Sequence, residues 1–281
     1  MIQKSFDEQK PTLYVVATPI GNLQDITYRA VETLKSVDLI LCEDTRISGK
    51  LLKAYQIEKP LLSYHDHNKH LREQDILEHL KQGLSLALIS DAGTPGISDP
   101  GYELIQAVIR EGYPVVSIPG ASALLAALVV SGLAIQPFVF LGFLPRKQSD
   151  KKTLLTSYSD RKETLVIYES PLRVETTLKD LHHFLGNRHV VLARELTKRF
   201  ETIVRTTLDS VHEFTLDTRG EYVIIIDGAL EPNYDHLSLS EHVKFFLAQG
   251  LDEKEAMKKV AKLRQVSKSD VYKNYKVLHK D

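Results

Sequence analysis

The sequence has few of the features that mark secreted, membrane-spanning or zinc-binding proteins. Its one cysteine, Cys42, excludes an internal disulfide and a cysteine-based zinc site. The longest apolar run, 123–130, is far too short to span a bilayer, and the polar residues 1–10 have the character of neither a signal peptide nor a membrane anchor. We therefore expect a cytoplasmic protein in a reducing environment.

The chain also lacks a net charge of either sign. It has 36 Lys and Arg against 37 Asp and Glu, so no global basic field draws it to nucleic acid. Hydrophobic residues make up 43% and charged residues 26%, which excludes disordered, collagen-like and coiled-coil classes. A length of 281 residues is enough for about two domains.

Several nucleotide-binding and catalytic motifs are absent. Neither Gly-x-Gly-x-x-Gly nor Gly-x-x-x-x-Gly-Lys-Ser/Thr occurs, which argues against nicotinamide dehydrogenases, P-loop NTPases and Rossmann-type methyltransferases. Gly-x-Ser-x-Gly and His-Glu-x-x-His are missing too, so nothing supports a hydrolase.

Strands and helices alternate along the part of the chain before residue 230. In the first half the pattern predicts strands at 12–17, 38–42, 61–64, 84–89 and 114–118, and helices at 27–35, 45–55, 69–81, 102–110 and 121–130. This spacing predicts βαβ units around a mostly parallel sheet. The second half alternates less regularly, with strands at 138–143, 164–168, 190–193 and 222–226 and one clear helix at 172–185.

These patterns predict an α/β fold class with a small helical tail. We place an N-terminal α/β domain at 11–122, a second α/β domain at 123–232 and a C-terminal helical domain at 236–281. In the tail, Asp252 and Glu255 predict a capping box after a helix that stops at Gly250.

The last predicted helix of the tail follows a short break that resembles a helix-turn-helix. Ser267 and Asp270 predict its cap, and its apolar face repeats at Val271, Tyr275 and Leu278. The tail has ten Lys and Arg against six Asp and Glu, so it carries +4 and the remainder carries −5.

The strongest local feature is the segment SDAGTPGISDPG at 90–101, between a buried strand and a helix. Its glycines and prolines impose an unusual backbone path at the carboxyl end of a strand, where open α/β sheets bind ligands. The alternative is a connection in which Asp99 caps the next helix. The turns at 18–22 and 118–123 are of the same kind and face the same sheet edge; Ser122 could offer a hydroxyl to a ligand or cap a helix.

Polar residues follow other strands. The segment Glu43-Asp44-Thr45-Arg46 could position a ribose or accept a proton, or Asp44 could cap the helix that follows. The ligand spacing of His65, His67 and His70 is too incomplete for a metal site, so we expect none, and a surface for a polar substrate is favoured. Basic side chains after later strands suit phosphate, the alternative being surface charge: Arg173, Arg194, Lys198 and Arg199.

Seven segments occur in the order of a known family: VATPIGN (16–22), EDTR (43–46), SDAGTPGISDPG (90–101), PGASA (119–123), GFLPR (142–146), YESPLR (168–173) and ARELTK (193–198). Together they resemble the tetrapyrrole (corrin/porphyrin) methylase superfamily. Within it, the chain is similar to the bacterial enzymes that methylate the ribose 2′-oxygen of a cytidine in 16S ribosomal RNA of the small ribosomal subunit. The resemblance covers residues 11–230 well and extends to the helical tail.

The resemblance implies two α/β domains of the tetrapyrrole methylase type, S-adenosylmethionine in the cleft between them, and a homodimer. The residues that it assigns to the cofactor are Pro19, Gly93, Thr94, Gly96, Ile97, Ser122, Ala123 and Tyr168. The chain departs from the tetrapyrrole branch in one loop, which reads Ala-Gly-Thr-Pro instead of Gly-Asp-Pro.

Methyl transfer to a ribose hydroxyl requires alignment and a nearby proton acceptor. The candidate acceptors are Asp44, Glu43 and Glu169. We expect RNA contacts from the basic tail and from Arg46, Arg173, Arg194, Lys198 and Arg199, with packing or dimerisation as the alternative role of the tail. Two other functions stay open: a tetrapyrrole methyltransferase, and a non-catalytic nucleic-acid-binding protein.

Overall fold

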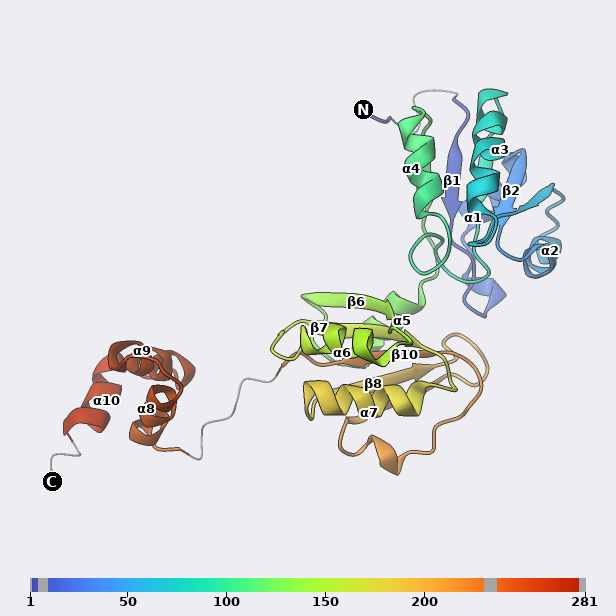
Figure 1. Cartoon of the computed structure of the whole chain (residues 1–281). Coiled ribbons are helices and arrows are strands. Elements are labelled where there is room, and N and C mark those ends of the chain that lie inside the picture. The colour runs from blue at the N-terminus through green and yellow to red at the C-terminus, as the bar shows by residue number, and fades with distance from the viewer. Residues whose placement is uncertain (1, 5–9, 230–236, 278–281) are drawn as a thin grey trace. The chain divides into compact units, whose positions relative to one another are not determined.

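The computed structural model describes residues 2–4, 10–229 and 237–277, except for the side chains of His70 and Val277. The chain forms two compact units, Met1–Ala229 and Leu230–Asp281 (Figure 1). Within the described ranges, no helix combines the length and apolar character needed to cross a membrane.

The first sheet of the first unit is entirely parallel, as predicted, with the strand order β3-β2-β4-β1-β5. Its strands are β1 (Leu13–Val16), β2 (Leu39–Cys42), β3 (Leu61–Ser63), β4 (Leu86–Leu88) and β5 (Val115–Ile118). Because all five run in one direction, the turns that follow them lie along the same edge.

Helices cover both faces of this sheet. They are α1 (Tyr28–Ser36), α2 (Thr45–Ala54), α3 (Lys69–Lys81) and α4 (Tyr102–Arg110). Buried side chains of α1 and α2 pack on one face, and those of α3 and α4 on the other. A parallel sheet buried on both faces has apolar strands, which is why this half follows its sequence pattern closely.

The second sheet is mixed, with the order β6-β7-β10-β8-β9. Its strands are β6 (Phe138–Phe143), β7 (Thr164–Glu169), β8 (His189–Arg194), β9 (Thr202–Thr207) and β10 (Tyr222–Ile226). Only the β6–β7 pair is parallel; the other three are antiparallel. The edge strand β9 was not predicted, because its sequence TIVRTT is polar and it is not fully buried at any position.

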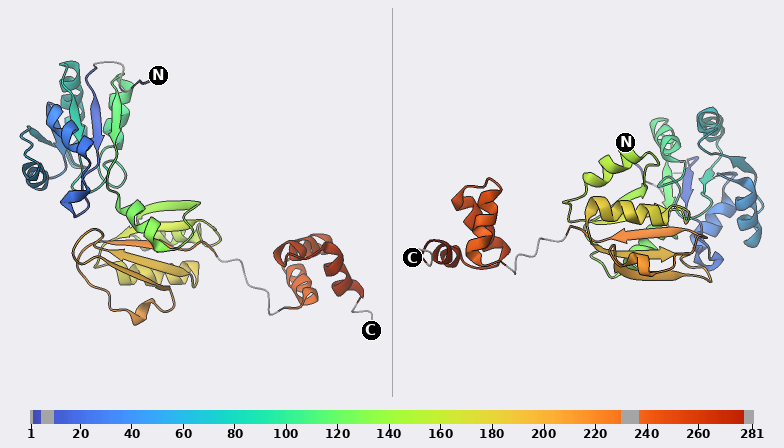
Figure 2. Two further views of the ribbon diagram at one scale, coloured as in Figure 1. Left: turned by 180° about the vertical axis from the view of Figure 1, so that it is seen from behind. Right: turned by 60° about the horizontal axis from the view of Figure 1, so that its bottom comes forward.

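Three helices cover the second sheet: α5 (Ala123–Ser131), α6 (Gln148–Thr156) and α7 (Val174–Leu185) (Figure 2). Helices α6 and α7 pack on one face, whereas α5 packs on the other, in a cluster that also holds Ile20 from the turn after β1. Helix α6 was not predicted either, since it buries only Lys151 and Leu155. The predicted domain limits stay a prediction.

The second unit contains α8 (Leu239–Ala248), α9 (Glu253–Leu263), α10 (Lys268–Tyr272) and a π-helical turn, Lys273–Val277. These helices share their own apolar core. Asp252 accepts a hydrogen bond from Glu255 N, one half of the predicted box, whereas Ser238 and Glu241 form both halves of such a box at α8. The predicted apolar contact of Leu278 lies outside the described residues.

Candidate functional site

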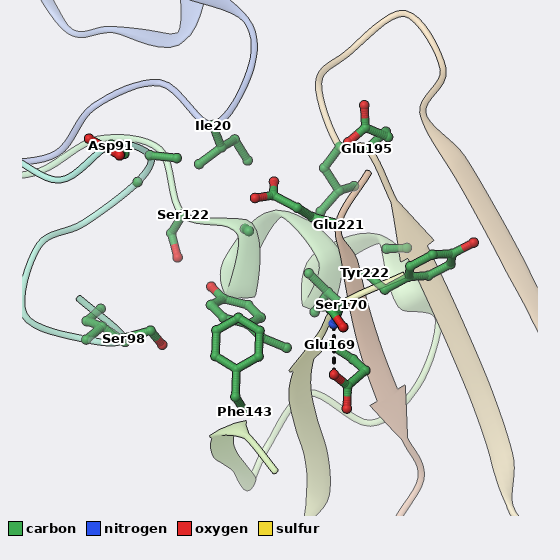
Figure 3. A pocket seen from close by; sticks show the side chains of 18 of the residues that line it. Ile20, Asp91, Ser98, Ser122, Phe143, Glu169, Ser170, Glu195, Glu221 and Tyr222 are labelled. Carbon is green, nitrogen blue, oxygen red and sulfur yellow. Dashed lines mark hydrogen bonds between the residues drawn. The ribbon is translucent and has the colours of Figure 1, made fainter. Parts of the chain in front are cut away.

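A pocket of about 360 Å³ opens where turns from both sheets of the first unit meet. The turns after β1, β4 and β5 form one side, and the ends of β6, β7 and β8 with the start of β10 form the other. Its volume lies within the range of small-molecule sites. In Figure 3, Ser122 and Phe143 face the same space from opposite sides.

The turns of the first sheet are joined by main-chain bonds. Thr18 N donates to Gly93 O at 2.8 Å, and Gly93 N donates back to Thr18 O at 3.1 Å. The Thr94 hydroxyl donates to Ala121 O at 3.3 Å, which connects the loop after β4 to the turn after β5. Gly93 has φ +79°, where a side chain is strained. Three segments far apart in sequence therefore form one rigid wall.

Asp99 lines the pocket instead of capping a helix. The alternative considered from the sequence is wrong, because the residue at the N-cap of α4 is Gly101 and no side chain bonds there. Burial raises the pKa of the Asp99 carboxyl, and the neighbouring charge of Asp91 adds to the rise. A carboxylate held in this way favours a ligand that brings positive charge.

Ser122 serves both predicted roles. Its hydroxyl oxygen accepts a hydrogen bond from Leu125 N at 3.5 Å at the N-cap of α5, and the residue also lines the pocket. A hydroxyl that accepts one bond still has its proton to donate.

Tyr168 anchors the opposite wall. Its hydroxyl accepts a hydrogen bond from Leu124 N at 2.9 Å, and its ring meets Phe140 and Phe143 edge to face, with centroids 4.8 and 5.8 Å apart. Burial raises the pKa of this phenol, so the hydroxyl remains protonated and can donate to a ligand.

Lys198 neutralises two carboxylates of the pocket. Its Nζ lies 2.8 Å from a Glu195 oxygen and 3.4 Å from a Glu221 oxygen. Burial alone lowers the pKa of this ammonium, but the bonds and charges of the two glutamates outweigh that effect and raise it. A Cβ added to Gly21 would stand 2.4 Å from Lys198 Cγ, so only glycine leaves room for the lysine stem.

The loop that carries Lys198 is strained. Glu195 and Thr197 have φ of +52° and +67°, a conformation that costs non-glycine residues energy and is concentrated at functional sites. A Cβ on Gly220 would stand 2.5 Å from the Glu195 carboxylate. The side chain of Glu195 thus packs closely against Gly220, just before β10, where any larger residue would displace it.

Most of the residues assigned to the cofactor by resemblance come together here. Of the eight, six line the pocket: Gly93, Thr94, Ile97, Ser122, Ala123 and Tyr168. Pro19 and Gly96 are not among the lining residues. Gly96 lies within the loop, and a Cβ added there would stand 3.6 Å from Ile105 Cδ1 and 3.9 Å from Tyr102 N of α4.

The three candidate proton acceptors differ in their surroundings. Asp44 lies outside the pocket lining, caps α2 and pairs with Arg46 at 2.6 Å, and these bonds hold the pKa of its carboxyl well below the usual range. Glu169 lines the pocket, but its oxygens accept bonds from Ser170 N at 2.8 Å and Thr177 Oγ1 at 2.7 Å.

Glu43 stands outside the lining residues at the end of β2. Burial raises the pKa of its carboxyl, and the charges of Asp91 and Asp99 add to the rise. Within the described part of the chain, no hydrogen bond or ion pair occupies this side chain. Of the three, it is the carboxylate with the greatest freedom to accept a proton.

Of the predicted RNA contacts, Lys198 alone lines the pocket. Arg46 is paired with Asp44, Arg173 lies 3.5 Å from Glu169, and Arg194 pairs with Asp217 at 3.0 Å. The guanidinium of Arg199 lies 5.7 Å from the centroid of the Phe200 ring. The basic residues are therefore spread around the unit and mostly held by carboxylates.

The histidine segment does not assemble a metal site from the residues that the structure describes. The rings of His65 and His67 meet edge to face at 5.9 Å between centroids. The side chain of His70 lies outside the described residues.

Sequence reasoning missed several pocket residues. Phe143 and Glu195 stand inside segments that were singled out, GFLPR and ARELTK, but neither was given a role. Ile20, Glu221 and Tyr222 also line the pocket. Nothing in the sequence near Glu221 marks it, because its approach to the pocket depends on the antiparallel pairing of β10.

Comparison with known proteins gives a consistent result. Residues 12–212 match the family model of the tetrapyrrole (corrin/porphyrin) methylases. Proteins named ribosomal RNA small subunit methyltransferase I are similar over nearly the whole chain. The one from Halalkalibacterium halodurans is 45% identical and the alignment covers 97% of this chain and 98% of the relative. The one from Synechocystis is 47% identical, and the alignment covers 92% of this chain and 95% of the relative.

Solved structures share the fold at lower identity. Cobalt precorrin-4 methyltransferase aligns with a TM-score of 0.58 at 20% identity, covering 79% of this chain and 96% of the other. Uroporphyrin-III C-methyl transferase from Thermus thermophilus, complexed with S-adenyl homocysteine, aligns with a TM-score of 0.56 at 22% identity, covering 77% and 97%. Diphthine synthase aligns with a TM-score of 0.60 at 13% identity, covering 78% and 90%.

Proposed function

Because the chain belongs to the tetrapyrrole (corrin/porphyrin) methylase family, and within it to the proteins named ribosomal RNA small subunit methyltransferase I, we propose that it methylates small-subunit ribosomal RNA with S-adenosylmethionine. The finer proposal is transfer to the ribose 2′-oxygen of a cytidine in 16S ribosomal RNA. The observation that supports the use of S-adenosylmethionine is the pocket that brings Gly93, Ser122 and Tyr168 around one space. The identity of 44–47% to these relatives favours an RNA substrate over a tetrapyrrole.

The residues of the pocket fit the proposed cofactor. Its wall at Gly93 is a surface of small residues against which a small or flat group can lie closely, and the carboxylate of Asp99 suits a cation. Tyr168 and Ser122 keep protons to donate to a carboxylate or a hydroxyl. S-adenosylmethionine supplies an electrophilic methyl group on a positively charged sulfur.

The chain itself has to orient the ribose hydroxyl and take up its proton. Alignment can supply about 7–11 kcal/mol of the barrier reduction, and a positioned acceptor typically adds 10²–10⁴-fold in rate. Among the three predicted carboxylates we propose Glu43 as the acceptor, since Asp44 and Glu169 are occupied by Arg46 and Thr177.

Glu43 does not line the pocket itself, but its carboxyl interacts with the charges of Asp91 and Asp99, which do, so the hydroxyl would react at that edge of the pocket. Glu43→Gln should lower the single-turnover rate at saturating substrate roughly 100-fold, and Asp44→Asn should lower it far less.

RNA binding is assigned to the +4 tail together with the basic residues near 194–199. The tail is a compact unit with its own core, so its removal leaves the clusters of the first unit intact. A chain ending at residue 229 should bind ribosomal RNA more weakly and S-adenosylmethionine equally well. Equal RNA affinity with and without the tail would contradict this assignment and favour packing or dimerisation as the role of the tail.

The direct test is methyl transfer to small ribosomal subunits and to free 16S ribosomal RNA with labelled cofactor, followed by mapping of the modified position. We expect one labelled ribose, on a cytidine. Calorimetric titration with S-adenosylmethionine distinguishes a methyltransferase from a non-catalytic nucleic-acid-binding protein, because the latter binds no cofactor. Label on a base, or on neither RNA, would contradict the proposal.

A further inference from the structure

Phe143 is a large apolar side chain that is not buried in a hydrophobic core. It ends the edge strand β6, its surface is 56% exposed, and it lines the pocket. Figure 3 shows its ring projecting into the space opposite Ser122. An exposed aromatic ring at a pocket wall has its face available to a ligand.

The local backbone is built to aim this ring. The register between β6 and β7 shifts between Phe140 and Gly142, which leaves Leu141 as an extra residue, and Gly142 has φ +63°. In a regular strand, residues three apart point to opposite faces. The bulge cancels that alternation, so Phe140 and Phe143 both contact the ring of Tyr168.

Tyr168 in turn fixes the position of Phe143. Its hydroxyl is held by Leu124 N at the start of α5, and its ring lies between the two phenylalanines. The exposed ring is therefore supported by a partly buried aromatic pair, and it does not depend on a loop for its position. A rigid aromatic surface of this kind stacks flat ligands with little loss of side-chain entropy.

The charge of the pocket indicates which part of an RNA can enter. The carboxylates of five residues line it, against one lysine, Lys198: Asp91, Asp99, Glu169, Glu195 and Glu221. Phosphates are repelled from such a space, whereas a neutral base and its ribose are not. Enzymes that do chemistry on a base extrude it from its stack, and unpaired RNA bases are commonly stacked on aromatic side chains.

We propose that Phe143 stacks on the base of the target nucleotide and thereby holds its ribose in the pocket. This inference rests on the proposed function and adds to it the recognition of an extruded, unpaired pyrimidine nucleotide. Stacking on an aromatic side chain is typically worth a factor of roughly 5 to 150 in affinity per base.

The test compares Phe143→Ala, Phe143→Leu and Phe143→Trp with the wild type, using small ribosomal subunits and labelled S-adenosylmethionine. The measured quantities are the KM for subunits, the single-turnover rate at saturation, and the Kd for S-adenosylmethionine alone. The matched control is Phe138→Ala, which removes the same side chain from the other end of β6, 37% exposed and outside the pocket lining.

We expect Phe143→Ala to raise the KM for subunits roughly 5- to 150-fold, with the Kd for S-adenosylmethionine within twofold. Phe143→Trp should restore the KM, Phe143→Leu should not, and Phe138→Ala should match the wild type. If Phe143→Ala does not fold, the contrast between Trp and Leu at this position decides alone.

Four results would overturn the inference. They are an unchanged KM in Phe143→Ala, an equal loss of S-adenosylmethionine affinity, full rescue by leucine, or an altered oligomeric state of Phe143→Ala in sedimentation. The last would show that the ring covers another copy of the chain. These four results count against the inference only when the wild-type protein methylates RNA. A wild type that labels no RNA contradicts the proposed function instead.

Discussion

The two sheets of the first unit build their sides of the pocket from different parts of the chain. The parallel sheet contributes turns of small residues that are joined through main-chain groups, such as Thr18 with Gly93. The mixed sheet contributes large side chains, among them Phe143, Tyr168 and Lys198. Substitutions on the first side should therefore act through backbone geometry, and those on the second through the chemical group removed.

The largest expected effect is on the backbone side. Gly93→Val places a β-branched side chain at φ +79°, which costs about 1–3 kcal/mol and displaces the loop that the pocket uses. We expect the affinity for S-adenosylmethionine, measured by calorimetry, to fall roughly 5- to 150-fold.

The matched control for this substitution is Gly112→Val. Gly112 has φ +82°, a Cβ added there would meet no atom within 4 Å, and the residue follows α4 outside the pocket lining. This variant should lose a similar amount of stability and keep its affinity for S-adenosylmethionine. Equal affinity in both folded variants would mean that the main-chain wall does not hold the cofactor.

The next effect concerns a hydroxyl on the side-chain side. Tyr168→Phe leaves Leu124 N without its acceptor, so the free energy of unfolding should fall by about 0.5–1.5 kcal/mol in urea titrations. If the same hydroxyl donates to the cofactor, its affinity falls roughly 2- to 10-fold as well.

Tyr222→Phe provides the comparison. Tyr222 also lines the pocket, but its hydroxyl is engaged by the main chain, donating to Asp217 O at 2.9 Å, so the substitution likewise removes one hydrogen bond between a phenol and the main chain. The free energy of unfolding should fall by a comparable amount with no change in cofactor affinity. A variant of Tyr168 that behaves like this control would restrict Tyr168 to a structural role.

A smaller effect is expected from the charge of Asp99. S-adenosylmethionine carries one more positive charge than its product S-adenosylhomocysteine. Removing a carboxylate from the pocket should therefore weaken the substrate more than the product. In Asp99→Asn, the Kd for S-adenosylmethionine divided by the Kd for S-adenosylhomocysteine should rise roughly 2- to 5-fold at neutral pH.

The same substitution changes the dependence of stability on pH. Because burial raises the pKa of Asp99 in the folded state, its ionised form opposes folding. That opposition is absent below the pKa of the unfolded chain and is complete above the raised folded pKa. The ligand-free Asp99→Asn variant should melt at a higher temperature than the wild type at pH 7, and the difference should vanish toward pH 4. A constant difference across this range would contradict the assignment.

The smallest effect is expected at the basic residues. Arg199 lies over Phe200, whereas Arg46 is held by Asp44. Arg199→Gln should reduce the slope of log K for RNA against log salt by about one. Arg46→Gln should reduce it less, since its charge is already shared with a carboxylate. Equal slopes for both variants and the wild type would mean that neither arginine contacts the RNA.

The limits of sequence reasoning follow the same division. The helices 69–81 and 102–110 were predicted with the bounds that the structure has, because apolar strands and amphipathic helices alternate cleanly around a sheet covered on both faces. In the second half, β9 and α6 were missed because few of their residues are buried. The antiparallel pairing of β10 was not expressed in any local pattern.

The candidate site divides in the same way. Gly93 and Ser122 stand in motifs at the ends of parallel strands, which bring such ends to one edge, so their meeting could be anticipated. Tyr168 belongs to the second sheet, and only the family resemblance indicated that it would join them. The occupation of Asp44 by Arg46 and of Glu169 by Thr177 could not, since hydrogen bonds of side chains depend on distances that the order of residues does not contain.

The amino-acid sequence alone determined the α/β class, the parallel first sheet, the positions of the ligand-facing turns and the family. These properties reside in hydrophobic periodicity, in turn residues and in motif order, all of which are local along the chain. Only the tertiary structure decided that Lys198 meets Glu195 and Glu221, and that a bulge turns Phe143 toward the pocket. Such contacts arise from strand register and from close packing between distant segments, where a shift of one residue changes which side chain faces the site.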